Sequence, residues 1–421
     1  MRAFYSFMWV LALPLVLARL WWRGRKEPGY RAHWGERLGF YSSSTRAAGK
    51  SIWVHAVSVG ETRAAEPLVD ALMAAYPGHR IVLTHMTPTG RATGRSLFAK
   101  HGERLVQAYL PYDIGFLVAR FIRHFSPSLL VLMETEVWPN LIATARAMDV
   151  PVALVNARLS ERSLRRGRRF GKLMTDAARA ISVVAAQTGD DAARILSLGA
   201  PHVGVTGSIK FDVVVPQAAL DLGAWLSARF GERKVFLCAS TRDGEEQQIL
   251  EAFTRTDPSA RPLLLLVPRH PQRFDEVAAL AQAAGLSVQR RSQLDDGEVA
   301  SDVVLGDSMG EMFAYFAASD VAFIGGSLEP LGGQNLIEAC ALGKPVLIGQ
   351  HTFNFAQVSD EAVASGAARR VADAQDLVDA ALGLLADDGQ RQAMGARAAA
   401  FANQHRGATA RTLGLLAPFI A

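Results

Sequence analysis

One carboxylate in the chain lies where an expected strand passes into an expected helix. Residues 53–63 read W-V-H-A-V-S-V-G-E-T-R, an apolar run that ends at Gly60 and Glu61. Apolar alternation before Gly60 predicts a strand, and helical spacing from Ala65 to Met73 predicts a helix after it. Open parallel sheets bind ligands where their strands end, so Glu61 is a candidate general base. Alternatively, Glu61 only complements the dipole of the helix that it begins.

Further loops of the first half carry specific polar residues after expected strands. They are T-H-M-T-P-T-G (84–90), L-P-Y-D (110–113), M-E-T-E-V-W-P-N (133–140), N-A-R-L-S (156–160) and T-G-S-I-K-F-D (206–212). Because parallel strands end at one edge of a sheet, these loops are expected to line one cleft. Glu134 and Glu136 are candidates for an acid and base pair. An acid in this position also commonly begins a helix, here at residues 138–140.

The second half supplies candidate contacts for an anion. The loops S-T-R-D-G-E-E (240–246) and V-P-R-H-P-Q-R-F (267–274) follow expected strands and bring cationic side chains to a sheet edge. These side chains are Arg242, Arg269, His270 and Arg273. Arginine offers a fixed fork of donors that suits phosphate and carboxylate groups. We therefore expect an anionic ligand at this edge.

Two glycine-containing loops of the second half lead into expected helices. They are G-D-S-M-G-E-M (306–312) and G-G-S-L-E-P-L-G-G-Q-N-L-I-E-A (325–339). Exposed amide N–H groups at helix starts, together with the helix dipole, form phosphate sites without a metal. Asn335 and Glu338 lie one turn apart, so Glu338 is placed to accept hydrogen bonds from ribose hydroxyls. The alternative is a flexible surface loop.

The chain lacks several motifs that would indicate other chemistry. It contains no G-x-x-x-x-G-K-[ST] phosphate loop, no G-x-G-x-x-G dinucleotide fingerprint and no H-E-x-x-H zinc motif. The two cysteines, Cys238 and Cys340, each lie inside an apolar run, which indicates buried thiols of a reducing compartment. No metal or cofactor is therefore expected, and helix dipoles with Arg and Lys would stabilise a leaving phosphate.

Composition allows a two-domain globular protein. The chain has 421 residues, is 50% hydrophobic and carries a net charge of +5. That length accommodates two domains of ordinary size. The modest basic excess suits acidic small molecules, an anionic membrane surface or nucleic acid, so charge alone does not choose among them.

The N-terminus has the composition of a membrane anchor. Residues 4–20 are apolar except for Ser6 and Arg19, and W-W-R-G-R-K follows at 21–26. Tryptophans beside a basic cluster are typical of an interfacial anchor whose basic side stays cytoplasmic. The stretch is slightly short for a span and Pro14 interrupts it, so spanning and half-inserted anchors both remain open. No cleavage site for a secretory signal follows.

Short apolar runs that alternate with helical patterns predict an α/β fold with two doubly wound parallel sheets. Expected strands of the first sheet are 52–57, 81–84, 129–133, 152–155, 182–185 and 202–206, and those of the second are 235–239, 263–267, 303–305, 321–324 and 345–348. The expected organisation is an anchor (1–26), a basic juxtamembrane linker (27–50), a first Rossmann-like domain (51–215), an interdomain linker (216–232), a second Rossmann-like domain (233–405) and a closing helix (406–421).

These motifs together closely resemble the bacterial 3-deoxy-D-manno-octulosonic acid (Kdo) transferases of lipopolysaccharide synthesis. The similarity runs from R-G-R-K at 23–26 to H-T-F-N-F at 351–355. It implies a GT-B architecture, in which two Rossmann-like domains face a cleft. It also implies a first domain that binds the acceptor, a lipid A precursor, and a second domain that binds CMP-Kdo. The expected location is the cytoplasmic face of the inner membrane, and no nucleic acid partner is implied.

The resemblance also implies roles for individual residues. It assigns the catalytic base to Glu61 and transition-state contacts to Glu134 and Lys210. Nucleotide contacts are implied for Arg269 and His270, for Met309, Gly310 and Glu311, and for Asn335, Leu336, Ile337 and Glu338. Arg242 is added on chemical grounds, because its guanidinium suits the charged groups of the donor.

The expected reaction is an inverting, metal-independent transfer of Kdo to lipid IVA. Two alternatives remain at this stage. One is another GT-B enzyme, either a lipid glycosyltransferase with a uridine donor or a nucleotide-sugar epimerase. The other is a two-lobed, membrane-tethered binding protein, which would also have paired α/β domains.

Overall fold

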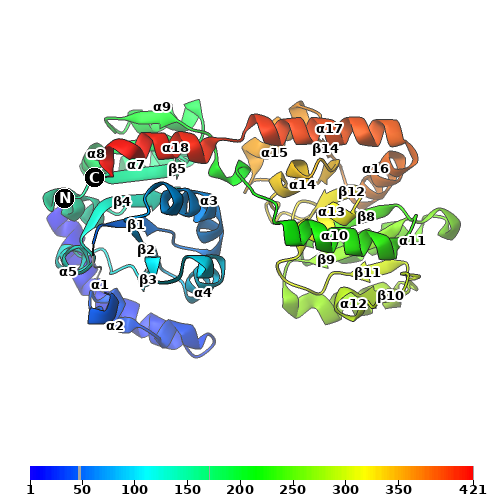
Figure 1. Cartoon of the computed structure of the whole chain (residues 1–421), viewed down its shortest axis with the longest axis horizontal. Helices are drawn as coiled ribbons and strands as arrows, with labels where there is room; N and C mark the ends of the chain where they lie inside the picture. The colour runs from blue at the N-terminus through cyan, green and yellow to red at the C-terminus, as the bar shows by residue number, and fades with distance from the viewer. Residues whose placement is uncertain (46–48, 170, 421) are drawn as a thin grey trace. The chain divides into compact units, whose positions relative to one another are not determined.

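The computed structural model describes residues 1–45, 49–169 and 171–420. Within it the chain forms two units, Met1–Asp212 together with Arg406–Ala421, and Val213–His405. Each unit is built on a parallel sheet with helices on both faces (Figure 1). The predicted α/β class with two doubly wound sheets is therefore confirmed.

The first unit has the strand order β3-β2-β1-β4-β5-β6-β7, and the paired strands are parallel. The strands are β1 (Ser51–His55), β2 (Arg80–His85), β3 (Leu105–Tyr109), β4 (Pro127–Met133), β5 (Val152–Ala157), β6 (Val183–Ala186) and β7 (Val203–Val205). The order reverses between β1 and β4, where Trp53 pairs with Leu130 and His55 with Leu132. Such a switch point opens a crevice at the carboxyl ends of the two strands.

Alternate side chains of β1 build the cores on the two faces of this sheet. Ile52 and Val54 pack in a cluster with α3 (Val59–Ala75) and α18 (Ala408–Leu416), whereas Trp53 packs with α5 (Gly115–Phe125) and α6 (Pro139–Ala147) on the other face. The helices of the unit are α1 (Arg2–Arg23), α2 (Trp34–Arg37), α3 (Val59–Ala75), α4 (Pro88–Leu97), α5 (Gly115–Phe125), α6 (Pro139–Ala147), α7 (Glu161–Arg169), α8 (Lys172–Ala180), α9 (Gly189–Leu196) and α18 (Ala408–Leu416). The fully buried Trp53 ring stacks on Phe121, with ring centroids 4.1 Å apart. Packing on both faces fixes β1 in the sheet and so fixes the position of Glu61, which follows β1 in the first turn of α3.

The second unit repeats the architecture, with the strand order β10-β11-β9-β8-β12-β13-β14. Its strands are β8 (Val235–Thr241), β9 (Leu263–Pro268), β10 (Val288–Arg290), β11 (Val303–Leu305), β12 (Val321–Ile324), β13 (Val346–Ile348) and β14 (Ala368–Arg370). Its helices are α10 (Gln217–Phe230), α11 (Glu245–Thr254), α12 (Phe274–Ala283), α13 (Met312–Ala318), α14 (Ile337–Ala341), α15 (Ala356–Ala364), α16 (Ala374–Ala386) and α17 (Asp388–Gln404). The switch point lies between β8 and β12, so the loops after these two strands meet at one edge.

The expected linker at residues 216–232 is wrong. Residues Gln217–Phe230 form the regular helix α10, which packs on α13 of the second unit. Gly223 allows this contact, because a Cβ there would lie 2.6 Å from the Cβ of Ala317. The second unit accordingly begins at Val213.

The segment expected as a basic linker at residues 27–50 is largely folded onto the first unit, although residues 46–48 lie outside the described part of the chain. Arg37 is buried, donates to the carbonyl of Met86 at 3.0 Å and stacks on the ring of Tyr109. Glu36 pairs with both terminal nitrogens of Arg91, at 2.6 and 3.1 Å. These buried contacts hold the segment against the loop after β2.

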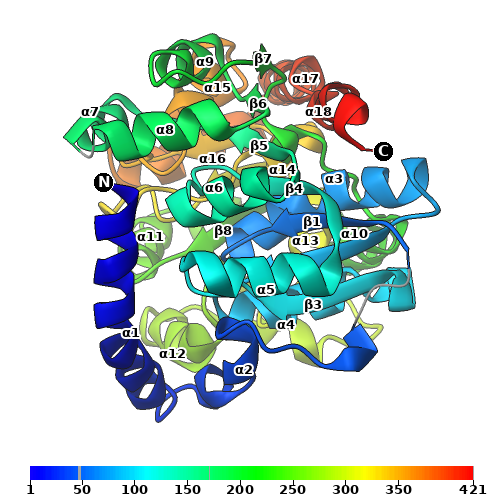
Figure 2. The same cartoon turned by 90° about the vertical axis from the view of Figure 1, so that its left-hand side faces the viewer.

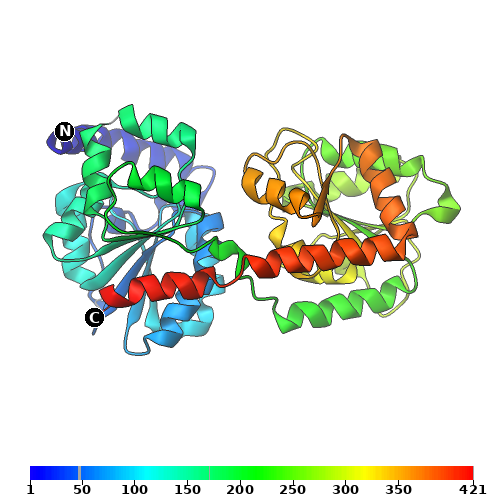
Figure 3. The ribbon, with the colours of Figure 1, turned by 90° about the horizontal axis from the view of Figure 1, so that it is seen from above.

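The C-terminal residues return to the first unit as α18, which packs on α3 (Figure 3). The carboxylate of Asp212 accepts hydrogen bonds from the N–H groups of Gly407, at 2.5 Å, and Thr409. One side chain therefore joins the end of the first unit's main segment to the returning chain.

Candidate functional site

Glu61 lies in the first turn of α3, at the carboxyl end of β1. Ser58 is the N-cap, and its hydroxyl accepts a hydrogen bond from the N–H of Glu61 at 3.5 Å. The Glu61 carboxylate accepts from the N–H of Val57 at 2.8 Å and from the Ser58 hydroxyl at 3.5 Å. This is a reciprocal capping arrangement, so Glu61 does stabilise the start of its own helix, as the alternative interpretation expects.

The carboxylate of Glu61 is nevertheless poised for proton transfer. Burial raises the pKa of Glu61 to about 7, the Val57 hydrogen bond opposes the shift, and the negative charges of Glu136 and Glu134 add to it. The effect of burial therefore exceeds that of the hydrogen bonds from Val57 and Ser58, which lower the pKa. A carboxylate with this pKa is a much stronger base than an ordinary glutamate and remains partly ionised at neutral pH.

Glu134 and Lys210 form an ion pair at the same edge of the sheet. Glu134 follows β4, Lys210 follows β7, and the Nζ to Oε1 distance is 2.8 Å. Asn156, at the end of β5, directs its side-chain amide at the same Glu134 oxygen at 3.5 Å and accepts from the N–H of Ile209 at 3.1 Å. Asn156 thus holds both partners of the pair in place.

The backbone at two of these positions is strained. Glu134 has a φ of 54° and Asn156 a φ of 52°, in the left-handed region that non-glycine residues seldom adopt. Strain of this kind persists where surrounding contacts enforce it and is common at functional sites. At Glu134 the N–H donates to the Val155 carbonyl at 2.9 Å, which fixes the turn out of β4.

Glu136 completes the acidic edge without a cationic partner among the described residues. It accepts a hydrogen bond from the indole N–H of Trp138 at 2.8 Å, and burial raises its pKa. Trp138 is the N-cap of α6 and Pro139 is its first residue, as the sequence predicts. Glu136 therefore acts on Glu61 through its charge, while Glu134 acts through its charge and its pairing with Lys210.

His55 belongs to the core, as expected. It is fully buried in β1, and its Nδ1 lies 2.9 Å from the hydroxyl of Thr84. Burial lowers the pKa of His55 to about 3, so its ring is neutral at physiological pH. Glu61, in contrast to His55, is partly exposed to solvent and can titrate near neutral pH.

In the second unit, a cationic cluster follows the central strands β8 and β9. Arg242 lies after β8, and Arg269 and His270 lie after β9. Burial lowers the pKa of His270, and the positive charges of Arg242, Arg269 and Arg273 lower it further. A ring flanked by cations indicates that an anion would be favourable here.

Arg273 is not available to an anionic ligand, contrary to the expectation from the sequence. Its guanidinium lies 2.8 Å from both carboxylate oxygens of the fully buried Glu246 and 3.1 Å from Glu276. Arg273 is therefore committed to neutralising Glu246. Arg242, in contrast, makes no side-chain hydrogen bond or ion pair within the described residues.

Several backbone amides of the glycine-rich loop after β12 already donate to a buried carboxylate. The fully buried carboxylate of Glu245 accepts from the N–H groups of Gly326 at 2.6 Å, Ser327 at 2.9 Å and Leu328 at 3.0 Å. The expected cradle of exposed amides is thus wrong for residues 326–328. Their donors instead fix this loop against the start of α11.

Other amides of these loops remain open. The N–H groups of Met309, Gly310 and Glu311 donate to no described residue, and neither do those of Asn335 and Leu336. Helices α13 and α14, which follow, are only seven and five residues long. Individual amides rather than a long helix dipole are therefore the available anion donors.

The side chains in these two stretches have differing roles. Leu336 and Ile337 are buried in the core, so only their backbone is available to a ligand. Asn335 donates to Glu338 at 3.2 Å, which orients the carboxylate expected to meet a ribose. Glu311 pairs with Arg291 at 3.1 Å. Ser308 lies in a G-x-S-x-G run, but its hydroxyl contacts Glu311 and Tyr315 rather than a histidine.

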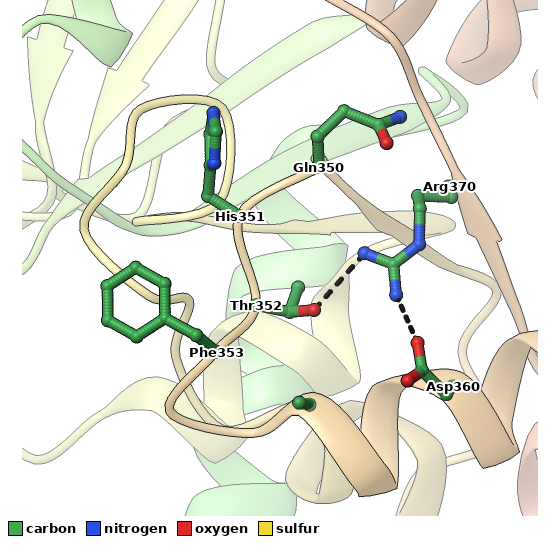
Figure 4. Close-up of a pocket in the computed structure, with 7 residues that line it drawn as sticks. Gln350, His351, Thr352, Phe353, Asp360 and Arg370 are labelled. Atoms are coloured by element: carbon green, nitrogen blue, oxygen red, sulfur yellow. Dashed lines mark hydrogen bonds and ion pairs between the residues drawn. The ribbon is translucent and has the colours of Figure 1, made fainter.

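A cavity of about 370 Å³ lies at the same edge of the second sheet, after β13 (Figure 4). Its walls include Gln350, His351, Thr352, Phe353 and Arg370. Arg370 donates to the Thr352 hydroxyl at 3.1 Å and to Asp360 at 2.7 Å, as the dashed lines in Figure 4 mark. The H-T-F-N-F loop thus borders a hollow beside the glycine-rich loop, whose Ser327 carbonyl accepts from the N–H of His351 at 2.9 Å.

Sequence reasoning missed the supports of both edges. Asn156 appeared only as part of a loop, and Glu245 as part of an arginine loop, yet each holds two functional segments together. The sequence offers one indication for Glu245: two adjacent glutamates, Glu245 and Glu246, stand at an expected helix start, where acidic residues commonly cap the helix. In the part of the chain that the structure describes, no group of three or more His, Cys, Asp or Glu side chains is arranged to hold a metal ion.

Two protein families match the two units. Residues 32–213 match the family described as 3-deoxy-D-manno-octulosonic-acid transferase (kdotransferase). Residues 288–401 match the family described as glycosyl transferases group 1. Both descriptions are of glycosyltransferases.

Curated relatives match along nearly the whole chain. A 3-deoxy-D-manno-octulosonic acid transferase of Bordetella pertussis is 49% identical over 417 residues, which is 96% of each chain. The transferase of the same description from Haemophilus influenzae is 36% identical and covers 100% of this chain and 99% of its own. A solved UDP-GlcNAc 2-epimerase of Neisseria meningitidis covers 88% of this chain and 100% of its own, with a TM-score of 0.62 and 16% identity, and so shares the fold. The protein is a glycosyltransferase of GT-B architecture, and the chain belongs to the 3-deoxy-D-manno-octulosonic acid transferase family.

Proposed function

We propose that the protein transfers Kdo from CMP-Kdo to lipid IVA, with inversion at the anomeric carbon and without a metal ion. The acceptor is assigned to the first unit and the donor to the second. Family membership supports the transferred sugar, and the cationic edge of the second unit suits a nucleotide phosphate. The acidic edge of the first unit suits activation of an acceptor hydroxyl.

The observation that carries the proposal is the environment of Glu61. Its carboxylate lies at the switch point of the first sheet, with a pKa of about 7. It would take the proton from a glucosamine 6'-hydroxyl of the acceptor. A positioned base of matched pKa contributes roughly 100-fold to 10,000-fold to such a reaction.

The bond changes follow from this assignment. The acceptor oxygen forms a bond to the anomeric carbon of Kdo on the face opposite CMP. The bond between that carbon and the phosphate oxygen breaks, and CMP leaves with the electron pair. The proton held by Glu61 then returns to solvent, so the carboxylate is regenerated for the next cycle.

The remaining residues stabilise charge around these events. Lys210, held by Glu134 at 2.8 Å, supplies a positive charge near the reacting groups. On the donor, Arg242, Arg269 and His270 would contact the phosphate. The open amides of residues 309–311 and 335–336 would contact the nucleotide, with Glu338 on the ribose.

We place the protein at the cytoplasmic face of the inner membrane. Helix α1 has 22 residues and is long and apolar enough to cross a membrane by length and composition. Arg23, Arg25 and Lys26 at its C-terminal end would remain with the anionic cytoplasmic leaflet. A membrane location also agrees with a lipid acceptor.

Mass spectrometry of the product tests the proposal directly. The full-length protein is incubated in detergent with lipid IVA and with CMP-Kdo generated in place, with and without a chelator. We expect lipid IVA to gain the mass of one or more Kdo residues at equal rates in both samples. Absence of a Kdo-bearing product would overturn the donor and acceptor assignment, and loss of turnover in the chelator would overturn the metal-independent step.

Nucleotide binding separates this proposal from a uridine-dependent enzyme of the same fold. We expect CMP to bind more tightly than UMP in a calorimetric titration of the full chain. Tighter binding of UMP would favour a glycosyltransferase or epimerase that uses a uridine donor.

A further inference from the structure

Helix α1 lies along one side of the first unit (Figure 2) and contacts it from Tyr5 to Leu20. Its half-buried and buried residues recur at helical spacing: Tyr5, Ser6, Trp9, Ala12, Leu13, Val16, Leu17 and Leu20. Trp9, Leu13, Val16, Leu17 and Leu20 join a cluster with Tyr30, Tyr112, Ile114 and Leu117 of the same unit. The spacing places this stripe on one side of the helix.

Two polar contacts fasten the N-terminal end of α1. The hydroxyl of Tyr5 donates to the carboxylate of Asp113 at 2.9 Å, and the hydroxyl of Ser6 lies 3.0 Å from the side-chain oxygen of Asn140. Asp113 is buried, and it also accepts from the N–H groups of Asn140 at 3.1 Å and Leu141 at 2.6 Å. The start of α1 is therefore bonded to the same carboxylate that caps α6, the helix that follows the Glu134 loop.

Both ends of the helix rest on one folded unit. Fifteen residues separate Tyr5 from Leu20, which is about 22 Å along a helix axis. A helix perpendicular to the bilayer, with Leu20 at one surface, would place Tyr5 about 22 Å deep in a hydrocarbon layer roughly 30 Å thick. Asp113 and the polar Asn140 at the start of α6, which bond Tyr5 and Ser6, would then lie inside the membrane, which is energetically very costly.

The opposite face of α1 is apolar and has no partner among the described residues. Phe4, Leu11, Leu15 and Trp22 are 69%, 55%, 74% and 68% exposed. They lie a half-turn away from the packed stripe, so one face of the helix is bound to protein and the other is bare. An exposed apolar helix face of this extent, in a chain that associates with a membrane, is expected to contact lipid.

Charge identifies the kind of lipid surface. Arg2 and Arg19 are exposed on the helix, and Arg23, Arg25 and Lys26 follow one another at its end. The guanidinium of Arg25 stacks on the ring of Trp21 at 4.7 Å, an arrangement that suits the headgroup region. Both ends of the helix therefore carry basic residues, which would meet anionic headgroups if both ends lie at one leaflet surface.

We propose that α1 lies in the plane of an anionic membrane surface, with its Phe4, Leu11 and Leu15 face in the outer hydrocarbon and its opposite face fixed to the first unit. The proposal rests on the proposed membrane location and resolves how the anchor inserts. The helix then contacts the bilayer on one side. On the other side its Tyr5 bonds Asp113, which in turn bonds the start of α6, next to the loop that contains Glu134.

Depth measurement by spin labelling tests this orientation. Single labels are placed at Phe4→Cys, Leu11→Cys, Leu15→Cys and Trp22→Cys in the full chain bound to vesicles that contain phosphatidylglycerol. Cys238 and Cys340 are buried and do not compete for the label. Ala396→Cys, exposed on α17, is the reference outside the membrane.

We expect equal, shallow depths at the four α1 positions, seen as oxygen collision rates that agree within about twofold, as for a helix that lies in the interface. A steep profile, deepest at Leu11 and Leu15 and shallow at Phe4 and Trp22, would overturn the proposal in favour of a span. Absence of contact between the labels and lipid would overturn it as well. Transfer activity in detergent is measured in parallel, so failure of the orientation is distinguishable from failure of the proposed reaction.

A second experiment tests the fastening of the helix. Tyr5→Phe removes the hydroxyl that bonds Asp113 and keeps the ring, whereas Phe4→Tyr adds a hydroxyl on the lipid face. We expect Tyr5→Phe to increase protease cleavage between α1 and the rest of the first unit in detergent by several-fold, and Phe4→Tyr to leave it unchanged. Equal cleavage of Tyr5→Phe and the unaltered protein would contradict the role of the Tyr5 and Asp113 contact.

Discussion

The carboxylate of Glu61 accepts a hydrogen bond from the N–H of Val57 at 2.8 Å, so the side chain assigned as the catalytic base also closes the first turn of its own helix. The bond fixes one carboxylate oxygen. The second oxygen has only the long 3.5 Å contact with Ser58 and is the one available to an acceptor hydroxyl. Positioning and reactivity are therefore divided between the two oxygens of one group.

The pH dependence of transfer should follow Glu61. Because its pKa is about 7 and the base must be ionised, kcat/KM should rise with pH through about 7 and then level off. A profile that is flat from pH 5 to 8 would show that another group governs the reaction.

Glu136→Gln should move this profile to lower pH. The negative charge of Glu136 raises the pKa of Glu61, and glutamine can still accept the hydrogen bond from Trp138. We expect the acidic limb of kcat/KM to shift down by about half a unit. Glu66→Gln, on the same helix and not among the charges that shift Glu61, is the control and should leave the limb in place.

Glu61 should also make stability depend on pH. Its pKa is raised from 4.5 in the unfolded chain to about 7, so the folded state binds the proton more tightly. Protonated Glu61 therefore favours folding, and this stability is lost as pH rises from about 4.5 through 7. Glu61→Gln, which carries no charge, should unfold at a higher temperature than the unaltered protein at pH 8, by a free energy of about 1 to 3 kcal/mol.

The same comparison at pH 4, which lies below both pKa values, supplies its control. Glu61 is then largely protonated and resembles glutamine, so the difference in thermal unfolding should nearly vanish. A difference of the same size at both pH values would contradict the raised pKa.

Gly60→Ala should separate folding from acceptor binding. A Cβ at Gly60 would have the Ser58 hydroxyl, at 3.9 Å, as its nearest neighbour, so the fold has room for it. We expect stability to rise by about 0.5 to 1 kcal/mol, because alanine favours the helix. If the acceptor sugar packs over Gly60, KM for the lipid should rise several-fold.

Gly383→Ala is the matched control for this test, since a Cβ there would meet nothing within 4 Å and the residue lies inside α16. It should stabilise the protein and leave KM unaltered. Equal KM values for Gly60→Ala and the control would place the acceptor away from Gly60.

Arg242→Ala should weaken donor binding and leave folding intact. Its guanidinium has no side-chain partner among the described residues, and it lies near His270. Loss of one charge-assisted phosphate contact corresponds to roughly 10-fold to 100-fold in the Kd for CMP. Calorimetry measures it, with the exposed Arg255→Ala as control. Unchanged CMP affinity would remove Arg242 from the donor site.

The sequence predicted the two sheets well because most of their strands are buried on both faces. Runs such as those of β4 and β9 are almost entirely apolar and stand out without structural information. Of the strands at the sheet edges, β3, β10 and β14 are not predicted. The first three residues of β3 are only half-buried and include Gln107, and β10 and β14 are three residues long and partly exposed. The sequence predicts a linker where α10 lies, because the close packing of Gly223 on Ala317 is visible only in the fold.

For the site, local patterns predicted where residues lie but not which donors are already used. The position of Glu61 follows from a strand, a glycine and a helix. In contrast, the N–H groups of Gly326 and Ser327 donate to the carboxylate of Glu245, which lies 81 and 82 residues away in the sequence. These amides are therefore not available to a ligand. Arg273 is similarly committed to Glu246. Such long-range pairing leaves no periodic signal in a sequence.

The most direct test of Glu61 as the base is the rate at which Glu61→Gln converts lipid IVA in the presence of CMP-Kdo, followed by mass spectrometry. The variant keeps an acceptor for the Val57 N–H but cannot take a proton at neutral pH. We expect Kdo transfer to fall by at least about 100-fold, while CMP binds with unchanged affinity. Transfer by Glu61→Gln at the rate of the unaltered protein, with the fold intact, would contradict the account.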